Sequence, residues 1–179
     1  MDLIKIPNTE NYFIDLKYRQ IYRFENGGYY PMDNSLPLVV VINNQTLTKD
    51  INWYYWYTVY DLKFPEGISI DLSKLRFEQI HVNKYSTNAY SYVPVYETRI
   101  TKTVNGVVYA VLPEYANYGI SKDGEIYSFK TNEIVRKTMG KLDEYYKATV
   151  SYIIYNFKLK RYSNITKFMQ VHRLVARAY

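Results

Sequence analysis

Residues 117–129 read Asn-Tyr-Gly-Ile-Ser-Lys-Asp-Gly-Glu-Ile-Tyr-Ser-Phe, and this stretch decides the fold because it predicts a β-hairpin. Ile120 and Ile126 stand on either side of Asp123-Gly124. An Asp-Gly pair supplies the positive φ angles that a tight turn between two strands demands. The sequence therefore predicts a strand, a turn and a strand over these residues.

A degraded copy of this hairpin occupies residues 11–24. Tyr12 and Ile14 precede a second strand that begins at Gln20, and Lys17-Tyr18 stands where the turn glycine should be. The loop of this copy has one extra residue. We interpret the two stretches as an internal repeat, in which the earlier copy keeps the hairpin but has lost its best turn residues.

The composition favours an α+β protein dominated by sheets. A hydrophobic content of 47% over 179 residues is enough for the core of one large domain or two small ones. The 23 tyrosines, against 7 phenylalanines and 2 tryptophans, are typical of half-exposed sheet faces, since a phenol buries its ring while its hydroxyl keeps a partner. The absence of cysteine excludes disulfides and thiolate metal sites.

The sequence gives no sign of a membrane segment or a signal peptide. No stretch approaches the ~18 consecutive apolar residues of a membrane span. The N-terminus begins with an acidic residue and reaches Pro7 before an apolar run can form. These features predict a soluble protein that stays inside the cell or is released by lysis.

We divide the chain into an N-terminal hairpin-containing unit (1–62), a connector with short strands (63–103) and a second unit (104–179). In the first unit, the β-branched run 38–42 predicts a strand buried on both faces. The aromatic run 53–60 predicts either a strand or the start of a short helix. Its rings could stack on bases, but packing against a sheet face is the favoured use.

The connector carries weaker signals. Residues 68–72 alternate with period two and predict a strand, and Asp71 or Ser73 is a candidate cap for a short turn that follows. Pro94 confines residues 92–96 to a sheet edge or an extended linker. His81 has no carboxylate or histidine at ligand spacing, so we assign it a structural or surface role.

The second unit is predicted to add strands around its hairpin and to end in a helix. Strands are predicted over 107–112, 134–137, 145–152 and 165–171. In the third of these, Ala148, Val150 and Tyr152 share one face. Residues 172–179 have the period of an amphipathic helix, and a helix this short must pack on the sheet to be stable.

Positive charge is concentrated in the last third of the chain. Residues 1–62 hold 5 Lys and Arg against 7 Asp and Glu, whereas residues 111–179 hold 12 against 6. Contacts to a DNA backbone require positive charge on one face, although a charged run is also the usual composition of a solvated surface. The candidate DNA-binding residues are Lys130, Arg136, Lys137, Lys147, Lys158, Lys160, Arg161, Lys167, Arg173 and Arg177.

Residues 113–179 resemble the phage-type HNH homing endonucleases, in which a nuclease-associated modular DNA-binding domain runs into the HNH fold. The matching pieces are 118–121 with 124–128, then 145–150, then 171–176, in the family order. The resemblance implies a DNA-binding protein of phage or mobile-element origin, in the host cytoplasm or associated with the virion. The family-motif residues are Tyr118, Gly119, Gly124, His172 and Arg173.

The resemblance also shapes what is expected of catalysis. In the family the helix leads into an Asn-His-x-Asp-Gly segment, which binds one divalent cation such as Mg²⁺ and supplies a general-base histidine. These 179 residues do not contain that segment, so we assign no catalytic residue, no metal ligand and no cofactor, and leave open whether the protein is an enzyme. His172 either orients the helix through a hydrogen bond to the preceding strand or contacts a phosphate.

The sequence therefore supports two candidate functions. The first is binding of double-stranded DNA without a nuclease centre in these residues. The alternative is a non-catalytic structural or interaction protein of a phage particle or phage–host complex, with protein partners or self-association. The acidic first unit and the abundant tyrosines favour the alternative, because tyrosine is enriched at protein interfaces.

Overall fold

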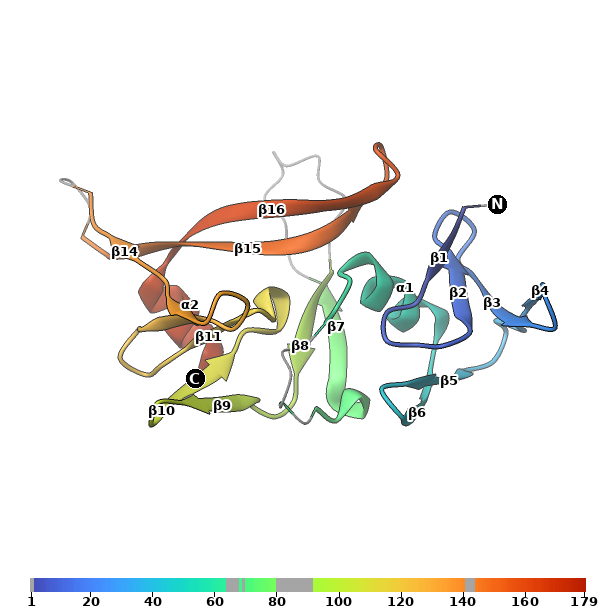
Figure 1. Ribbon diagram of the computed structural model, residues 1–179, viewed down its shortest axis with the longest axis horizontal. Helices are drawn as coiled ribbons and strands as arrows, with labels where there is room; N and C mark the ends of the chain where they lie inside the picture. The colour runs from blue at the N-terminus through green and yellow to red at the C-terminus, as the bar shows by residue number, and fades with distance from the viewer. Residues whose placement is uncertain (1, 64–67, 69, 80–91, 141–143) are drawn as a thin grey trace.

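The computed structural model describes residues 2–63, 68, 70–79, 92–140 and 144–179. The fold is α+β and sheet-dominated, as predicted: small antiparallel sheets carry most of the regular structure of these residues, and α-helices follow two of the hairpins (Figure 1).

The first unit is a four-stranded antiparallel sheet followed by a hairpin and a helix. The sheet has the strand order β1-β2-β3-β4, and β5 pairs with β6 before the chain enters α1. The elements are β1 (Leu3–Lys5), β2 (Tyr12–Asp15), β3 (Gln20–Glu25), β4 (Gly28–Pro31), β5 (Leu38–Ile42), β6 (Gln45–Lys49) and α1 (Ile51–Val59).

The aromatic run forms a helix, α1, and not a strand. Asp50 caps it, because its Oδ1 accepts a hydrogen bond from the Trp53 backbone N–H at 3.0 Å. Every residue from 53 to 59 is buried, so the helix has no polar face. The buried polar atoms keep partners: the Trp53 Nε1–H donates to the Leu75 carbonyl at 2.8 Å, and the Tyr54 hydroxyl lies 2.9 Å from the carbonyls of Leu38 and Leu47.

The prediction that residues 38–42 are buried on both faces is wrong. Leu38, Val40 and Ile42 are buried, but Val39 and Val41 are 49% and 44% exposed. The reason is that β5 belongs to a two-stranded sheet that packs only its inner face on the core, where α1 lies.

The connector contains η1 (Leu72–Lys74), β7 (Leu75–Gln79) and β8 (Tyr92–Tyr96). The predicted strand over 68–72 is wrong where it is described, because Asp71 caps η1 by accepting from the Ser73 N–H at 3.0 Å. The edge position of Pro94 is confirmed, since among the described residues β8 pairs with β7 alone. His81 lies outside the described residues.

The second unit contains a five-stranded sheet, a three-stranded sheet and a helix. Their strand orders are β13-β12-β11-β10-β9 and β14-β15-β16. The strand predicted over 134–137 forms only at its ends: Ile134 is in β13 and Lys137 is in β14, because the chain between them crosses from one sheet to the other. The elements are β9 (Thr101–Val104), β10 (Val107–Val111), η2 (Pro113–Tyr115), β11 (Tyr118–Ile120), β12 (Ile126–Ser128), β13 (Glu133–Ile134), β14 (Lys137–Thr138), β15 (Lys147–Asn156), β16 (Arg161–Gln170) and α2 (Val171–Ala178).

The hairpins β2–β3 and β11–β12 contain equivalent backbone hydrogen bonds. The Phe24 N–H donates to the Asn11 carbonyl at 2.7 Å, and the Phe129 N–H donates to the Asn117 carbonyl at 2.8 Å. Each hairpin also pairs two isoleucines across its strands, at 14 and 21 in the first and at 120 and 126 in the second. The first hairpin therefore has one more residue between its paired isoleucines than the second.

The turns of the two hairpins differ in their chemistry. Gly124 takes a φ of 76°, which favours glycine. In the first hairpin a non-glycine residue, Arg19, takes a φ of 50°, and the Asp15 side chain accepts hydrogen bonds from the N–H groups of Lys17 and Tyr18. The side-chain hydrogen bonds of an aspartate thus support the turn that lacks a glycine.

The long hairpin β15–β16 connects the two units (Figure 1). At the α2 end, Ala148 and Val150 are buried with Leu174 in the core of the second unit, as the alternation predicts. Toward the tip, Ile154 and Tyr155 belong to the core that contains α1. The Tyr162 hydroxyl donates to the Thr58 carbonyl of α1 at 2.7 Å, so the same hairpin holds both helices.

Replacing Gly119 with alanine is expected to lower the free energy of unfolding by about 2 kcal/mol, the usual cost of overpacking a core. A Cβ at this position would lie 2.6 Å from Phe129 Cζ and 2.6 Å from Tyr109 Cβ. Urea unfolding measures the change. Gly28→Ala is the control, because its nearest neighbours are ring atoms of Tyr30 at 3.4 Å. Equal stability of the two variants would contradict the packing argument.

Candidate nucleic-acid interface

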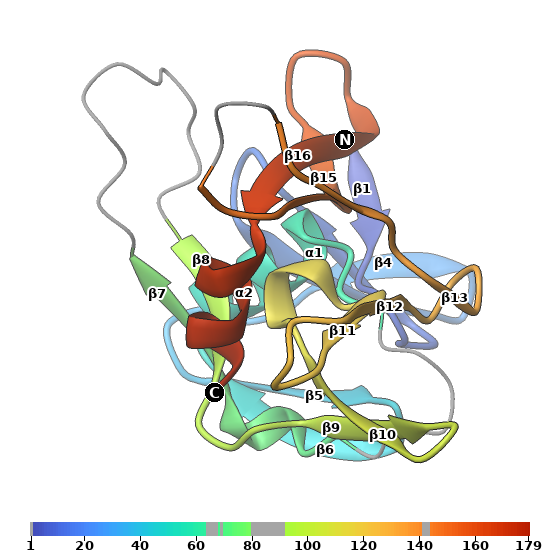
Figure 2. The ribbon, with the colours of Figure 1, turned by 90° about the vertical axis from the view of Figure 1, so that its left-hand side faces the viewer.

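A groove lies where the β15–β16 hairpin runs into α2. It has a volume of about 600 Å³, and we call it the α2 groove. Figure 2 shows β16 leading into α2, with β11 beside the helix. Among the side chains that line the groove are Thr138, Lys147, Phe168, Met169, Gln170 and Arg173.

The position of α2 follows from its two buried residues and from the hairpin turn. Val171 and Leu174 pack into the core with Ile120 and Ile126. Gly124 comes so close to the helix that a Cβ there would lie 2.9 Å from Val171 Cγ1. The helix therefore has a fixed orientation that leaves His172 and Arg173, in its first turn, exposed.

The α2 groove combines positive charge with accessible apolar surface. Lys147 and Arg173 line it, and Phe168 is 75% exposed on its wall. On the other face of the same sheet, the Nζ of Lys137 lies 5.7 Å from the ring centre of Tyr146. Cations beside exposed rings suit a polyanion that also presents sugars and bases, since the cations contact phosphates and the rings contact apolar edges.

His172 packs against an aromatic ring. Its ring centre lies 4.2 Å from that of Tyr145, with the planes 49° apart, and the histidine remains exposed at the rim of the first turn of α2. Both roles considered for His172, orienting the helix and contacting a phosphate, stay predictions.

A second group of the predicted cations lies at the tip of the long hairpin. Lys158 and Lys160 are in the loop between β15 and β16, and Arg161 begins β16. Lys160 Nζ lies 2.7 Å from Asp2 Oδ2, and this hydrogen bond raises the pKa of Lys160 and lowers that of Asp2. The tip cations are therefore separate from the α2 groove and adjoin the acidic first unit.

Arg177 forms an ion pair within the second unit. Its Nη2 lies 2.5 Å from Glu114 Oε2, and the Glu114 side chain is only 13% exposed. Burial raises the pKa of Glu114, while Arg177 acts in the opposite direction. Arg177 thus has a structural partner that the sequence did not indicate.

The remaining predicted residues are dispersed. Lys130 is exposed in the turn after β12, and Arg136 is exposed between β13 and β14. Lys167 places its Nζ 5.3 Å from the ring centre of Tyr152. Of the ten predicted cations, Lys147 and Arg173 line the α2 groove. Lys137 pairs with the buried Ala148 and so lies on the other face of the sheet from Lys147.

The family-motif residues on the hairpin are structural. The Tyr118 hydroxyl lies 3.1 Å from Ser151 Oγ, which ties β11 to β15, and Gly119 and Gly124 allow close packing. Sequence reasoning missed Phe168 as a residue of the α2 groove. The signal available was the outward face of the predicted strand pair, on which Phe168 is directly opposite Thr149.

Among the described residues, no three His, Cys, Asp or Glu side chains come together as a potential metal site. None of the helices in the described part of the chain is long and apolar enough to cross a membrane. No family model, curated protein or solved structure matches this chain.

Proposed function

We propose that this protein binds double-stranded DNA through the α2 groove. The observation that supports this most is the grouping of Lys147 and Arg173 with the exposed ring of Phe168 at one groove. These side chains come from β15, β16 and α2, so the sheet and the helix fix the spacing of their backbone positions. Fixed cations neutralise phosphates at a smaller entropic cost than flexible ones.

The resemblance to HNH homing endonucleases points to the same ligand. As part of this proposal the protein derives from a phage or mobile element and acts in the host cytoplasm or with the virion. Contacts to phosphate position a protein on a duplex, and base contacts specify the sequence. The α2 groove offers the first kind of contact through its cations.

We expect the affinity for a duplex of ~20 base pairs to fall about 12-fold between ~50 and ~200 mM salt, as two phosphate contacts in the α2 groove predict. Fluorescence anisotropy with a labelled duplex of mixed sequence measures this dependence. Absence of binding at ~50 mM salt, or an affinity that does not change with salt, would refute the proposal.

A second candidate function is protein interaction, supported by the outer face of the β5–β6 hairpin. Val39 and Val41 are about half exposed there and pair with Thr48 and Thr46 of β6. An apolar strip on an exposed sheet is a typical protein contact. Size-exclusion chromatography without DNA separates the two functions: a stable oligomer favours interaction, and a monomer that shifts only with DNA favours the first proposal.

A further inference from the structure

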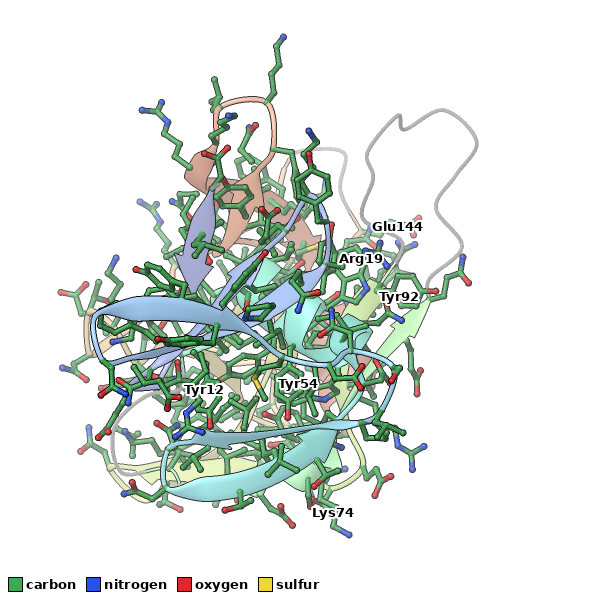
Figure 3. The ribbon with its side chains drawn as sticks, turned by 90° about the vertical axis from the view of Figure 1, so that its right-hand side faces the viewer. Tyr12, Arg19, Tyr54, Lys74, Tyr92 and Glu144 are labelled. Carbon is green, nitrogen blue, oxygen red and sulfur yellow. The ribbon has the colours of Figure 1, made fainter. Side chains whose placement is uncertain are left out.

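A second groove lies in the first unit, at the beginning of α1. It has a volume of about 540 Å³, and we call it the α1 groove. Figure 3 shows two of its residues, Arg19 from the turn of the first hairpin and Tyr92 from the start of β8. The residues used below are Arg19, Lys49, Asn52, Trp53, Arg76 and Tyr92.

The two grooves occupy equivalent places in the two units. In each unit a hairpin is followed by a helix: β6 leads through Asp50 into α1, and β16 leads directly into α2. The third helical residue lines the groove in both, as Trp53 in α1 and Arg173 in α2. The fourth helical residue, Tyr54 or Leu174, is fully buried in both.

The α1 groove also contains cations whose hydrogen bonds go to neutral acceptors. The Arg19 Nη1 donates to Asn52 Oδ1 at 2.6 Å, and Lys49 Nζ donates to the Ser73 carbonyl at 2.7 Å. A phosphate oxygen can replace such an acceptor with a gain, because charge-assisted hydrogen bonds are stronger than bonds to neutral groups.

Two carboxylates lie close to these cations and have partners of their own. Asp50 uses its Oδ1 to cap α1, and Glu97 forms an ion pair with Arg76. Neither of these contacts involves Arg19 or Lys49. A third carboxylate, Asp71, caps η1; its hydrogen bonds to Ser73 lower its pKa, and the nearby charge of Lys49 lowers it further. The aromatic wall is continuous, because Trp56 packs on Tyr92 with ring centres 5.1 Å apart, and Trp53 stacks on Tyr57 at 5.0 Å.

We propose that the α1 groove is a second site for the phosphodiester backbone of DNA, so that each unit of the chain holds one segment of the same duplex. This inference rests on the proposed function of the α2 groove. In Figure 3, Arg19 and Tyr92 lie on the same side of the view as Glu144, which is three residues before Lys147 of the α2 groove. That arrangement allows one long duplex to reach both grooves.

The test compares long and short duplexes. Arg19→Gln/Lys49→Gln is expected to weaken binding to a ~30-base-pair duplex by on the order of 10-fold at ~150 mM salt and to lower the salt slope by about 1.8, as the loss of two phosphate contacts predicts. Binding to a ~10-base-pair duplex, which fills one groove, should change less than about 2-fold because the α2 groove remains.

The control is Lys5→Gln/Arg23→Gln, which removes the same charge from strands of the first unit outside the groove. Asn52→Glu is a second variant, because a carboxylate in the first turn stabilises a helix and repels phosphate. It should weaken binding to the long duplex in the same direction. Thermal unfolding confirms that each variant is folded.

The outcomes separate the two proposals. If the unaltered protein does not bind either duplex, the proposed function itself fails. If it binds but the Arg19/Lys49 variant and Asn52→Glu bind the long duplex as tightly as the control does, the second site is overturned. A selective loss with the long duplex supports it.

Discussion

Replacing Arg177 with methionine is expected to lower the free energy of unfolding by about 3 kcal/mol at pH 7. The substitution leaves the carboxylate of Glu114, 13% exposed, without its ion-pair partner. Removing one partner of a buried ion pair destabilises a protein by more than the intact pair stabilises it, because the remaining charge stays desolvated. The expected loss is at the low end of the usual cost of breaking a buried ion pair, because the Arg177 side chain is 45% exposed. Urea unfolding measures the loss.

The pH dependence of the stability loss provides an independent test of this prediction. Burial raises the pKa of Glu114 above its usual 4.5, so the folded state binds this proton more tightly than the unfolded state. The stabilisation is therefore complete below that value and is lost as the pH rises through the folded pKa. Without Arg177 the pKa rises further, and the defect of the variant should shrink as the pH is lowered from 7 toward ~4.5.

Two comparisons isolate the buried charge as the cause. Glu114→Gln/Arg177→Met should recover most of the lost stability, because no charge is then left buried. Lys130→Met removes a cation from an exposed turn and should change stability by less than about 0.5 kcal/mol. If Arg177→Met were as stable as Lys130→Met at pH 7, the ion pair would not have the role assigned to it.

Local signals predicted the parts of the fold that local chemistry determines. The hairpin at 117–129 has alternating isoleucines and a turn glycine with a positive φ, and the structure contains it. The amphipathic period of 172–179 likewise predicted α2. Both signals act within a few residues and need no knowledge of distant packing.

Tertiary packing decided what the local signals left open. The run 53–60 is buried on all sides, so no period separates helix from strand, and the cap at Asp50 was the available sign of a helix. The run 38–42 is apolar throughout, yet Val39 and Val41 face outward because β5 lies in a two-stranded sheet. Burial of that strand depends on neighbours that its own sequence does not encode.

The sequence predicted the positive charge of the candidate site, but it did not predict which residues come together there. The sequence placed the cations in the last third of the chain, but it could not show that Arg177 meets Glu114 or that Lys160 meets Asp2. The equivalence of the two grooves was also hidden. It rests on the positions of Trp53 and Arg173 in their helices and not on shared residue types.

Charge reversal in the α2 groove, Lys147→Glu/Arg173→Glu, is expected to reduce affinity for duplex DNA more than about 100-fold at ~100 mM salt. The substitutions remove two phosphate contacts and place two carboxylates against the backbone, so electrostatic repulsion adds to the lost contacts. Fluorescence anisotropy measures the change, and thermal unfolding confirms that the variant is folded.

The matched control makes the same change of charge at the tip of the long hairpin, as Lys158→Glu/Arg161→Glu. Both variants lower the net charge by the same amount, so long-range attraction to DNA weakens equally in both. Only the contacts differ, because the tip cations lie outside the α2 groove. The affinity of the tip variant for duplex DNA should fall by less than about 5-fold. Equal losses would mean that net charge, and not the α2 groove, determines binding, and the site would have to be assigned elsewhere.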